Sequence, residues 1–359
     1  MESMVVSAAF WRDKRVFLTG HSGFKGSWLS LWLYQLGAKV TGFSLEPPTD
    51  PSLFVEAKIE KLLRAHIIGD IRDEKSLAQA MQYAEPDIVI HMAAQPLVRD
   101  SYNDPVTTYA TNVMGTVHLF EAARKTPSVK AILNITTDKC YENNEWLWGY
   151  RENEPMGGRD PYSSSKGCAE LVSSAYRSSF LSKSGIALAT ARAGNVIGGG
   201  DWAVDRIVPD AMRAFMQIQP LQVRNPNAVR PWQHVLEPLA GYLALGQKLF
   251  EQGQQFSEGW NFGPNEVDAK PVSYLADVMS NAWGEEASWQ FDVGEHPHEA
   301  NYLKLDCTKA KMLLNWCPQW ELSTALQQTV AWYKAWHRGS DMYQFSLQQI
   351  IAYGVGNHQ

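Results

Sequence analysis

The sequence predicts an α/β fold, in which a doubly wound parallel sheet carries a smaller α/β lobe on its C-terminal side. From Arg15 to about residue 194, short β-branched runs alternate with longer helical patterns. The runs are apolar on both faces, as strands are when helices cover both sides of a parallel sheet. After Gly194 this rhythm changes, and glycine and proline become frequent. A chain of 359 residues also exceeds the usual size of one core, which favours a second lobe.

Each strand is expected where a short apolar run is bounded by turn residues. The expected strands are Arg15–Thr19, Lys39–Phe43, His66–Ile68, Asp87–His91, Ala131–Thr136 and Ala187–Ala191. The expected helices between them are Gly26–Leu36, Asp73–Tyr83, Pro105–Arg124 and Pro161–Leu181. Proline suits the first position of a helix, and aspartate suits the N-cap, so these helices begin with favourable residues.

The second lobe begins after Gly194 and contains Gly198–Gly200 and several prolines. One later helical stretch, Glu237–Phe250, has the length to pack back on the first sheet. We therefore expect residues 1–194 to form the first domain, with 234–254 packing on it. Residues 195–233 and 255–359 are expected to form the second lobe.

Composition excludes several function classes. The formal charge is −6 and no Lys/Arg-rich run occurs, so neither nucleic acid nor an anionic membrane is an expected partner. The four cysteines are scattered without a CxxC pair, which favours free thiols over disulfides or a metal site. Glu2 stands where a signal peptide needs positive charge, and no run approaches the ~18 apolar residues of a membrane span. We expect a soluble, cytoplasmic protein.

A glycine loop follows the first expected strand and opens the first helix. Gly20, Gly23 and Gly26 have the spacing of a dinucleotide-binding turn. Glycines allow the tight turn and close approach of the backbone, while the helix N-terminus offers free N–H groups to a pyrophosphate. The loop therefore predicts a site for NAD or NADP.

The end of the second strand indicates which dinucleotide is preferred. An aspartate there would bond the adenosine ribose, but this chain has Ser44. No arginine stands beside it to receive a 2′-phosphate, so NAD is favoured, bound more loosely than in relatives that carry the aspartate. After the third strand, Asp70 could lie near the adenine amine, or it could serve as a cap or loop residue.

Two clusters of polar residues suit proton transfer. Tyr162 and Lys166 lie one helical turn apart, and a nearby ammonium and a positive nicotinamide would lower the pKa of the phenol so that it could act as a base. By itself such a pair is also common on solvated helix faces. Thr137, Asp138 and Lys139 follow the fifth strand, whose carboxyl end faces the ligand crevice in this fold. The alternative for them is a polar loop exit.

Together these motifs resemble the extended short-chain dehydrogenase/reductase family of nucleotide-sugar enzymes, which have the Rossmann fold. The resemblance extends to His91–Gln95, Thr111–Thr116, Glu145–Glu152 and Gly157–Tyr162. Within the family, the chain is similar to the 4,6-dehydratases that act on CDP-D-glucose. The resemblance implies a catalytic NAD, a homodimer that pairs through the helix carrying Tyr162, and a product that supplies deoxy- and dideoxyhexoses of bacterial surface polysaccharide (O-antigen).

The resemblance also implies roles for named residues. Catalytic roles fall to Tyr162, Lys166, Thr137, Asp138 and Lys139. Cofactor contacts fall to Gly20, Ser22, Gly23, Phe24, Lys25, Gly26, Ser44, Asp70, Ile71, Ala93, Ala94, Gln95, Asn112, Thr136, Tyr162 and Lys166. Substrate contacts fall to Gln95, Arg99, Asn195, Arg206, Arg224, Arg230 and Tyr302.

The implied reaction is an internal redox cycle. Tyr162 takes the proton of the C4 hydroxyl, Asp138 protonates the departing C6 hydroxyl, and Thr137 bonds the C4 oxygen. Thymidine-linked relatives carry a glutamate base where this chain has Lys139. A lysine serves as the C5 base if burial and cationic neighbours depress its pKa; alternatively, Lys139 only stabilises the enolate.

Some assignments keep alternatives. Each of the arginines could form a surface ion pair instead of binding phosphate, and the segment His298–Tyr302 lacks the arginine that thymidine-linked relatives carry. A 4-epimerase of the same family would not need Asp138 and Lys139. A non-catalytic NAD(H)-sensing regulator would not need both Tyr162 and Lys166.

Overall fold

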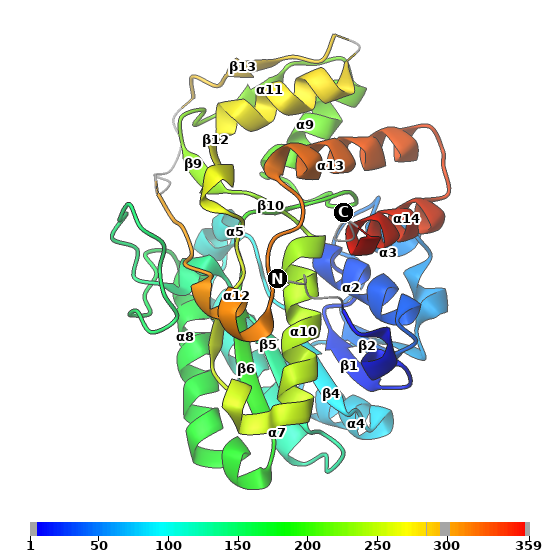
Figure 1. Ribbon diagram of the computed structural model, residues 1–359, viewed down its shortest axis with the longest axis vertical. Coiled ribbons are helices and arrows are strands. Elements are labelled where there is room, and N and C mark those ends of the chain that lie inside the picture. The colour runs from blue at the N-terminus through cyan, green and yellow to red at the C-terminus, as the bar shows by residue number, and fades with distance from the viewer. Residues whose placement is uncertain (1–5, 285, 295–301, 356–359) are drawn as a thin grey trace.

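A parallel sheet forms the centre of the lower lobe in Figure 1. The computed structural model describes residues 6–284, 286–294 and 302–355. Within these ranges, seven strands lie in the order β11-β6-β5-β4-β1-β2-β3. Their bounds are β1 Arg15–Thr19, β2 Lys39–Ser44, β3 Ala65–Ile68, β4 Ile88–His91, β5 Ala131–Ile135, β6 Ala187–Arg192 and β11 Gly259–Asn261. The first six confirm the expected strands, with no end shifted by more than one residue.

Helices cover both faces of this sheet, as a doubly wound fold requires. Successive strand residues point to opposite faces, so Val16 and Leu18 join the core beneath α2 and α10, whereas Phe17 joins the core beneath α4 and α7. All three side chains are buried, and each such burial stabilises the fold by roughly 1.5–3 kcal/mol. The bounds are α2 Phe24–Gln35, α10 Leu236–Gln252, α4 Glu74–Ala84 and α7 Gly115–Arg124.

The starts of the helices follow their capping residues. Asp73 caps α4, and Asp160 caps α8 (Pro161–Tyr176), where its Oδ1 accepts from the backbone N–H of Ser163 at 2.9 Å. A π-helical turn, residues 177–181, extends α8 to the expected end.

The expected helix Pro105–Arg124 is interrupted by a π-helical turn. It consists of α6 (Pro105–Tyr109), the turn Ala110–Met114 and α7. The turn carries Asn112, whose side chain bonds Gln95 and Ser165. Such turns recur at functional sites, and periodicity cannot reveal one extra residue in a turn.

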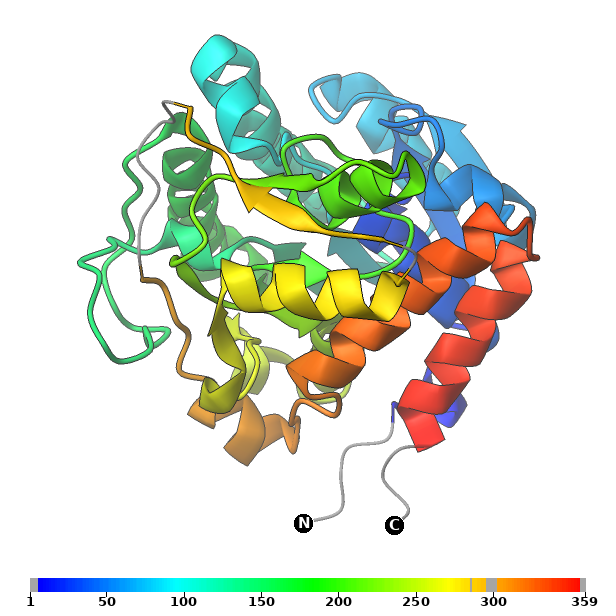
Figure 2. The same ribbon diagram turned by 90° about the horizontal axis from the view of Figure 1, so that it is seen from above.

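The second lobe lies over the carboxyl ends of the strands (Figure 1). Figure 2, seen from above, shows the yellow α11 and the orange α13 nearest the viewer. The larger helices of the second lobe are α9 Ile207–Met216, α11 Val272–Trp283 and α13 Leu322–His337. Short strand pairs complete it: β7 Val196–Ile197 with β10 Gln233–His234, β9 Val229–Pro231 with β12 Ala269–Pro271, and β8 Leu221–Val223 with β13 Trp289–Phe291.

The expected boundary at residue 255 is wrong in one respect. β11 lies beyond it, yet pairs with β6 as the edge strand of the large sheet. Two later helices, α12 (Thr308–Leu314) and α14 (Met342–Val355), contact α10 and α2 of the first lobe. A three-residue strand carries too little sequence pattern to be recognised, because its position depends on pairing with a distant strand.

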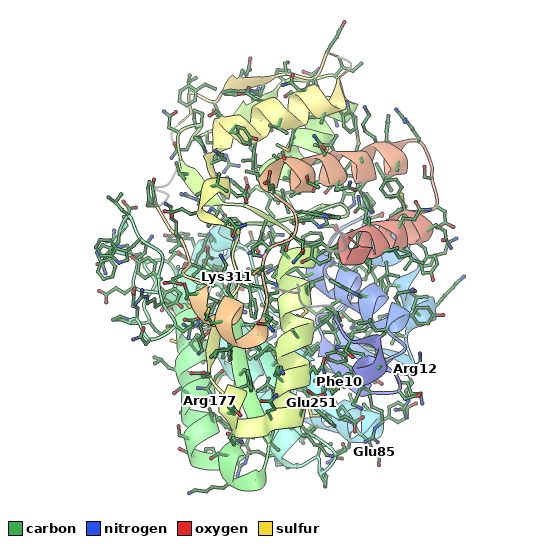
Figure 3. The ribbon with its side chains drawn as sticks, viewed as in Figure 1. Phe10, Arg12, Glu85, Arg177, Glu251 and Lys311 are labelled. Carbon is green, nitrogen blue, oxygen red and sulfur yellow. The ribbon has the colours of Figure 1, made fainter. Side chains whose placement is uncertain are left out.

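Aromatic side chains fill much of the interior. Trp11, Trp28 and Trp260 are fully buried, as are others near the lobe interface. Phe10 of the first helix, α1 (Ala8–Trp11), meets Phe250 of α10 edge-on, with ring centroids 5.6 Å apart; the label of Phe10 in Figure 3 marks this place. Most tryptophans therefore serve the core.

The composition-based expectations concern cysteines, metals and membranes. Cys140, Cys168, Cys307 and Cys317 are free thiols. Within the described ranges, no group of His, Cys, Asp and Glu side chains could hold a metal ion. None of the described helices is both long and apolar enough to cross a bilayer.

Candidate active site

The candidate site lies where the carboxyl ends of β1, β4, β5 and β6 meet beneath the second lobe. Gly20 follows β1, Ala93 follows β4, Thr137 follows β5 and Gly194 follows β6. This edge of a doubly wound sheet is where ligands bind. The start of α8 brings Tyr162 to the same edge.

The glycine loop has the geometry of a phosphate cradle. Gly20 has φ +75°, and a Cβ built on it would lie 2.6 Å from the backbone N of Ala93. A Cβ on Gly26 would lie 2.1 Å from the carbonyl oxygen of Gly20. No side chain caps the start of α2 at Gly23, so its first N–H groups can receive an anion. These residues fit a dinucleotide.

The expected ribose position is occupied by hydroxyl groups. The Oγ of Ser44 donates to the Oγ of Ser22 at 2.8 Å, and Ser22 donates to the carbonyl of Leu45. Both serines are buried. The end of β2 therefore offers neutral hydroxyls and no carboxylate.

Asp70 bonds the neighbouring Arg72 at an exposed position, whereas Ile71 is buried. Arg72 donates through Nη2 to Asp70 Oδ2 at 2.6 Å, and this bond lowers the pKa of Asp70. The backbone N–H of Arg72 also donates to Asp70, so the loop role, which was the alternative, describes its contacts. Ile71 is buried against Gly115.

The residues after β4 are braced against α8. Gln95 and Asn112 exchange backbone and side-chain bonds of 2.9 and 3.0 Å, and Asn112 donates to Ser165 at 2.8 Å. The Gln95 amide donates to Thr108. Ala93 donates through its N–H to Thr19, and Ala94 next to it is partly exposed at the edge. These contacts position the wall of the site.

Thr136 was expected to contact the cofactor, and its side chain points elsewhere. Its Oγ1 donates to Glu170 at 2.5 Å, behind the site. The hydroxyl of Thr136 therefore donates its hydrogen bond to a buried carboxylate, and its cofactor contact stays a prediction.

Tyr162 and Lys166 both lie buried on α8. Burial raises the pKa of Tyr162 to about 12, although Thr137 and the more distant Arg206 act to lower it. The expected lowering of this pKa depends on a positive nicotinamide as well as on Lys166, and it stays a prediction. Lys166 donates through Nζ to the carbonyl of Ile135 at 3.2 Å, and burial lowers its pKa to about 8.

The polar residues after β5 form a 3₁₀ turn, residues 138–140. Thr137 donates through Oγ1 to Asp138 Oδ1 at 2.9 Å. Asp138 is only 1% exposed, and its Oδ2 lies 1.8 Å from where a Cβ on Gly194 would stand. Lys139 is exposed, so the burial that was expected to make it a base is absent.

Several further charges converge on Asp138 and Tyr162. Lys25, between the glycines, has its pKa lowered to about 8 by burial and by Arg206, while Asp138 opposes the change. Arg206 pairs with Asp201 at 2.8 Å and interacts with the Tyr162 phenol. Lys25, which follows Phe24 in the glycine loop, therefore interacts electrostatically with the catalytic groups.

Two of the arginines expected to bind substrate meet on one carboxylate. Arg99 from α5 (Val98–Asn103) and Arg224, which follows β8, donate to the same Asp205 oxygen at 3.0 and 2.6 Å. Asp205 has φ +61°. The ion-pair alternative therefore describes both arginines in this structure.

The remaining expected substrate residues line the second lobe. Asn195 has φ +49°, and its carbonyl accepts from Gln233 N–H at 3.2 Å. Arg230 donates to the carbonyl of Val229 in β9. The carbonyl of Tyr302 accepts from Asn143; residues 298–301 lie outside the described residues.

A buried ion pair between Glu170 of α8 and Arg192 of β6 was missed by sequence reasoning. Arg192 donates to Glu170 through Nε at 2.9 Å and through Nη2 at 2.8 Å, and Thr136 and Thr190 also donate to Glu170. Burial alone raises the pKa of Glu170, but Arg192 and these bonds outweigh it and lower the pKa. The spacing of Glu170, one helical turn after Lys166, was the available signal.

Sequence comparisons find relatives that match nearly the whole chain. The family model described as GDP-mannose 4,6 dehydratase matches residues 17–329. The chain is 56% identical over 354 residues to CDP-glucose 4,6-dehydratase of Salmonella typhimurium, covering 97% of this chain and 98% of that protein.

Solved structures show the same fold. A UDP-glucose 4-epimerase of Stenotrophomonas maltophila with bound NAD has a TM-score of 0.79 at 21% identity, covering 91% of this chain and 100% of that one. A dTDP-glucose 4,6-dehydratase of Bacillus anthracis in complex with NAD has a TM-score of 0.74 at 21% identity, covering 91% and 99%.

Proposed function

The chain belongs to the GDP-mannose 4,6 dehydratase family, and from this premise we propose that it is a CDP-D-glucose 4,6-dehydratase. It would convert CDP-D-glucose to CDP-4-dehydro-6-deoxy-D-glucose and water. The observation that carries the proposal is the 56% identity to the Salmonella enzyme over 97% of the chain. The buried Asp138 and neighbouring Lys139 at the end of β5 support dehydration over 4-epimerisation, which needs neither.

NAD is the cofactor that the glycine loop and the Ser44 position suit. Bound NAD would supply the reversible oxidation that this reaction needs, without net change in the cofactor. Gly20, Gly23 and Gly26 would approach its pyrophosphate closely, because none has a side chain to obstruct it. Lys166 and Tyr162 would face its nicotinamide end.

Tyr162 is the base for the C4 hydroxyl. Its phenol lies at the edge of the sheet beside Thr137, whose hydroxyl bonds the C4 oxygen. Its pKa of about 12 in the chain alone must fall for this task, and cations lower a phenol pKa. Lys166 and a positive nicotinamide would both act in that direction.

Asp138 and Lys139 handle the elimination. Asp138 is the acid for the C6 hydroxyl, and we assign Lys139 as the C5 base, with enolate stabilisation as its alternative role. Lys139 is exposed and directly follows Asp138 after β5. Deuterium wash-in at C5 separates the two roles: Lys139→Ala should slow exchange, and exchange at the normal rate would refute the base.

The diphosphate end of the substrate would lie under the second lobe. Arg99 and Arg224 both donate to one carboxylate oxygen of Asp205, and this convergence supports a shared anion site. Arginine is suited to such contacts. Arg206 would lie toward the sugar. Further substrate contacts would come from Gln95, Asn195, Arg230 and Tyr302.

The direct test uses the product. The purified protein is incubated with CDP-D-glucose, alkali is added, and ultraviolet absorbance of a 4-keto-6-deoxy sugar is measured. Absorbance that Asp138→Asn abolishes supports the proposal. Epimerised sugar without that absorbance would support the epimerase, and NAD binding without turnover would support the sensor.

The proposal includes a homodimer in a reducing compartment. Val106 of α6 is 77% exposed and Leu171 of α8 is 60% exposed, and these helices contact each other; apolar groups so exposed favour association. Light scattering should show a dimer that Leu171→Asp weakens.

Free cysteines suit the reducing cytoplasm. We propose that the product supplies the dideoxyhexoses of O-antigen.

A further inference from the structure

The catalytic turn, residues 137–140, has long backbone hydrogen bonds. The N–H of Cys140 donates to the carbonyl of Thr137 at 3.3 Å, and the N–H of Tyr141 donates to the carbonyl of Asp138 at 3.5 Å. Well-formed bonds of this kind measure about 2.7–3.2 Å, so these two hold the turn only weakly. The position of Asp138 therefore depends on contacts outside the turn.

One buried ion pair bonds the residues on both sides of the catalytic turn. Before the turn, Thr136 donates through Oγ1 to Glu170 at 2.5 Å. After the turn, the hydroxyl of Tyr141 accepts from Arg192 Nη1 at 2.6 Å. Glu170 and Arg192 bond each other at 2.8 Å, and all four residues are buried. The ion pair therefore links the two ends of the turn.

Tyr141 is fixed at its hydroxyl and at its ring. Burial raises the pKa of the Tyr141 phenol, so the hydroxyl keeps its proton and donates it to Asn261 Oδ1 of β11 at 2.8 Å. The ring stacks on Tyr150, with centroids 5.3 Å apart and planes 21° apart. Tyr141 is 1% exposed and Asn261 is fully buried. The end of the turn is therefore attached to both β6 and β11.

The other catalytic pair is held without Tyr141. Tyr162 and Lys166 both belong to α8, and Lys166 donates through Nζ to the carbonyl of Ile135 at 3.2 Å. Neither contact involves the hydroxyl of Tyr141. Loss of this hydroxyl should therefore disturb the catalytic turn and leave the Tyr162–Lys166 pair in place.

We propose that Tyr141 is a positioning residue, whose hydroxyl holds Asp138 and Lys139 where they act on C6 and C5 of the substrate. The inference rests on the proposed dehydration, in which these two residues handle the elimination. Oxidation at C4 uses Tyr162 and Lys166 instead. Because a misplacement of 1 Å can lower a rate by roughly 10²-fold, loss of the Tyr141 hydroxyl should slow elimination and spare C4 oxidation.

The test uses Tyr141→Phe, which removes the hydroxyl and keeps the stacked ring. CDP-6-deoxy-D-glucose has no C6 hydroxyl to lose, so only its oxidation at C4 can occur: the C4 hydride passes to NAD and the hydroxyl proton to Tyr162. Stopped-flow absorbance of the reduced nicotinamide measures this rate. In the variant, turnover of CDP-D-glucose should fall by about tenfold or more, whereas oxidation of the 6-deoxy substrate should change far less.

Tyr353→Phe is the matched control. It removes another buried tyrosine hydroxyl, in α14, which donates to Glu237 at 2.7 Å. Because this bond lies outside the network around the catalytic turn, the ratio of the two rates should stay that of the unaltered protein.

The other outcomes overturn the inference. An equal loss with both substrates would show that Tyr141 only stabilises the fold, and no loss with either would show that the turn does not depend on its hydroxyl. Asn261→Ala removes the acceptor of the same hydroxyl and carries the test if Tyr141→Phe does not fold; it should show the same selective loss. If the unaltered protein acts on neither substrate, the proposed function fails, which is a separate result.

Discussion

The buried ion pair between Glu170 and Arg192 predicts a measurable contribution to stability. Glu170→Gln removes the charge of a carboxylate that accepts from Arg192 at 2.9 and 2.8 Å and from Thr136 and Thr190. The Arg192 side chain is 5% exposed, so its charge would lose its buried partner. Breaking a buried pair in this way costs about 3–5 kcal/mol.

Equilibrium unfolding in urea measures this cost. With a slope of about 3 kcal/mol per molar, the midpoint of Glu170→Gln should fall by about 1 M or more. Glu121→Gln is the matched control, because Glu121 pairs with Arg124 at a partly exposed position, where such pairs contribute about 1 kcal/mol or less.

The same pair predicts a pH dependence. The pKa of Glu170 is lowered on folding, so its stabilisation is present above the pKa of the unfolded chain and is lost as the pH falls through the folded value. The variant should therefore lose less stability than the unaltered protein in acid. A variant within 1 kcal/mol of the unaltered protein at neutral pH would refute the reasoning.

Three further predictions test other parts of the site and fold. Tyr162→Phe should lower kcat with CDP-D-glucose by roughly 10²–10⁴-fold with circular dichroism and NAD binding unchanged; a smaller loss would exclude Tyr162 as the base. Ser44→Asp, which restores a carboxylate at the end of β2, should tighten NAD binding by about tenfold, since a hydrogen bond to a charged group contributes about 1.5 kcal/mol or more; titration calorimetry showing an unchanged or weaker Kd would contradict this. Burial raises the pKa of Glu237 to about 7, so the folded chain binds more protons than the unfolded chain between pH 4.5 and 7. The folded protein should therefore lose stability as the pH rises through this range, by about 3 kcal/mol relative to Glu237→Gln. Parallel pH profiles of stability for the two proteins would show the prediction to be wrong.

Local sequence patterns predicted much of the fold and part of the site. The first six strands of the sheet and the cap of α4 follow from apolar runs and capping residues, because these depend on neighbours in sequence. The glycine loop and the Tyr162–Lys166 spacing likewise carry their chemistry in a few adjacent residues. The structure brings the glycine loop and the Tyr162–Lys166 pair to one edge of the sheet.

The features that sequence reasoning missed depend on distant contacts. β11 is three residues long and is defined by its pairing with β6. The bond from Thr136 to Glu170 depends on how α8 packs against β5. Lys139 is a different case, since its role as a base was made conditional on burial, and the side chain is exposed.

The central claim is that the chain moves hydrogen from C4 to C6 of one CDP-glucose molecule while NAD is regenerated. The most direct measurement uses an equal mixture of two substrates. One is CDP-glucose that carries both ²H at C4 and ¹³C, and the other is unlabelled CDP-glucose. The products are analysed by mass spectrometry. Transfer within one molecule predicts deuterium at C6 of the ¹³C-labelled product only. Deuterium lost to solvent, exchanged into the unlabelled product or retained at C4 of an epimer would contradict it.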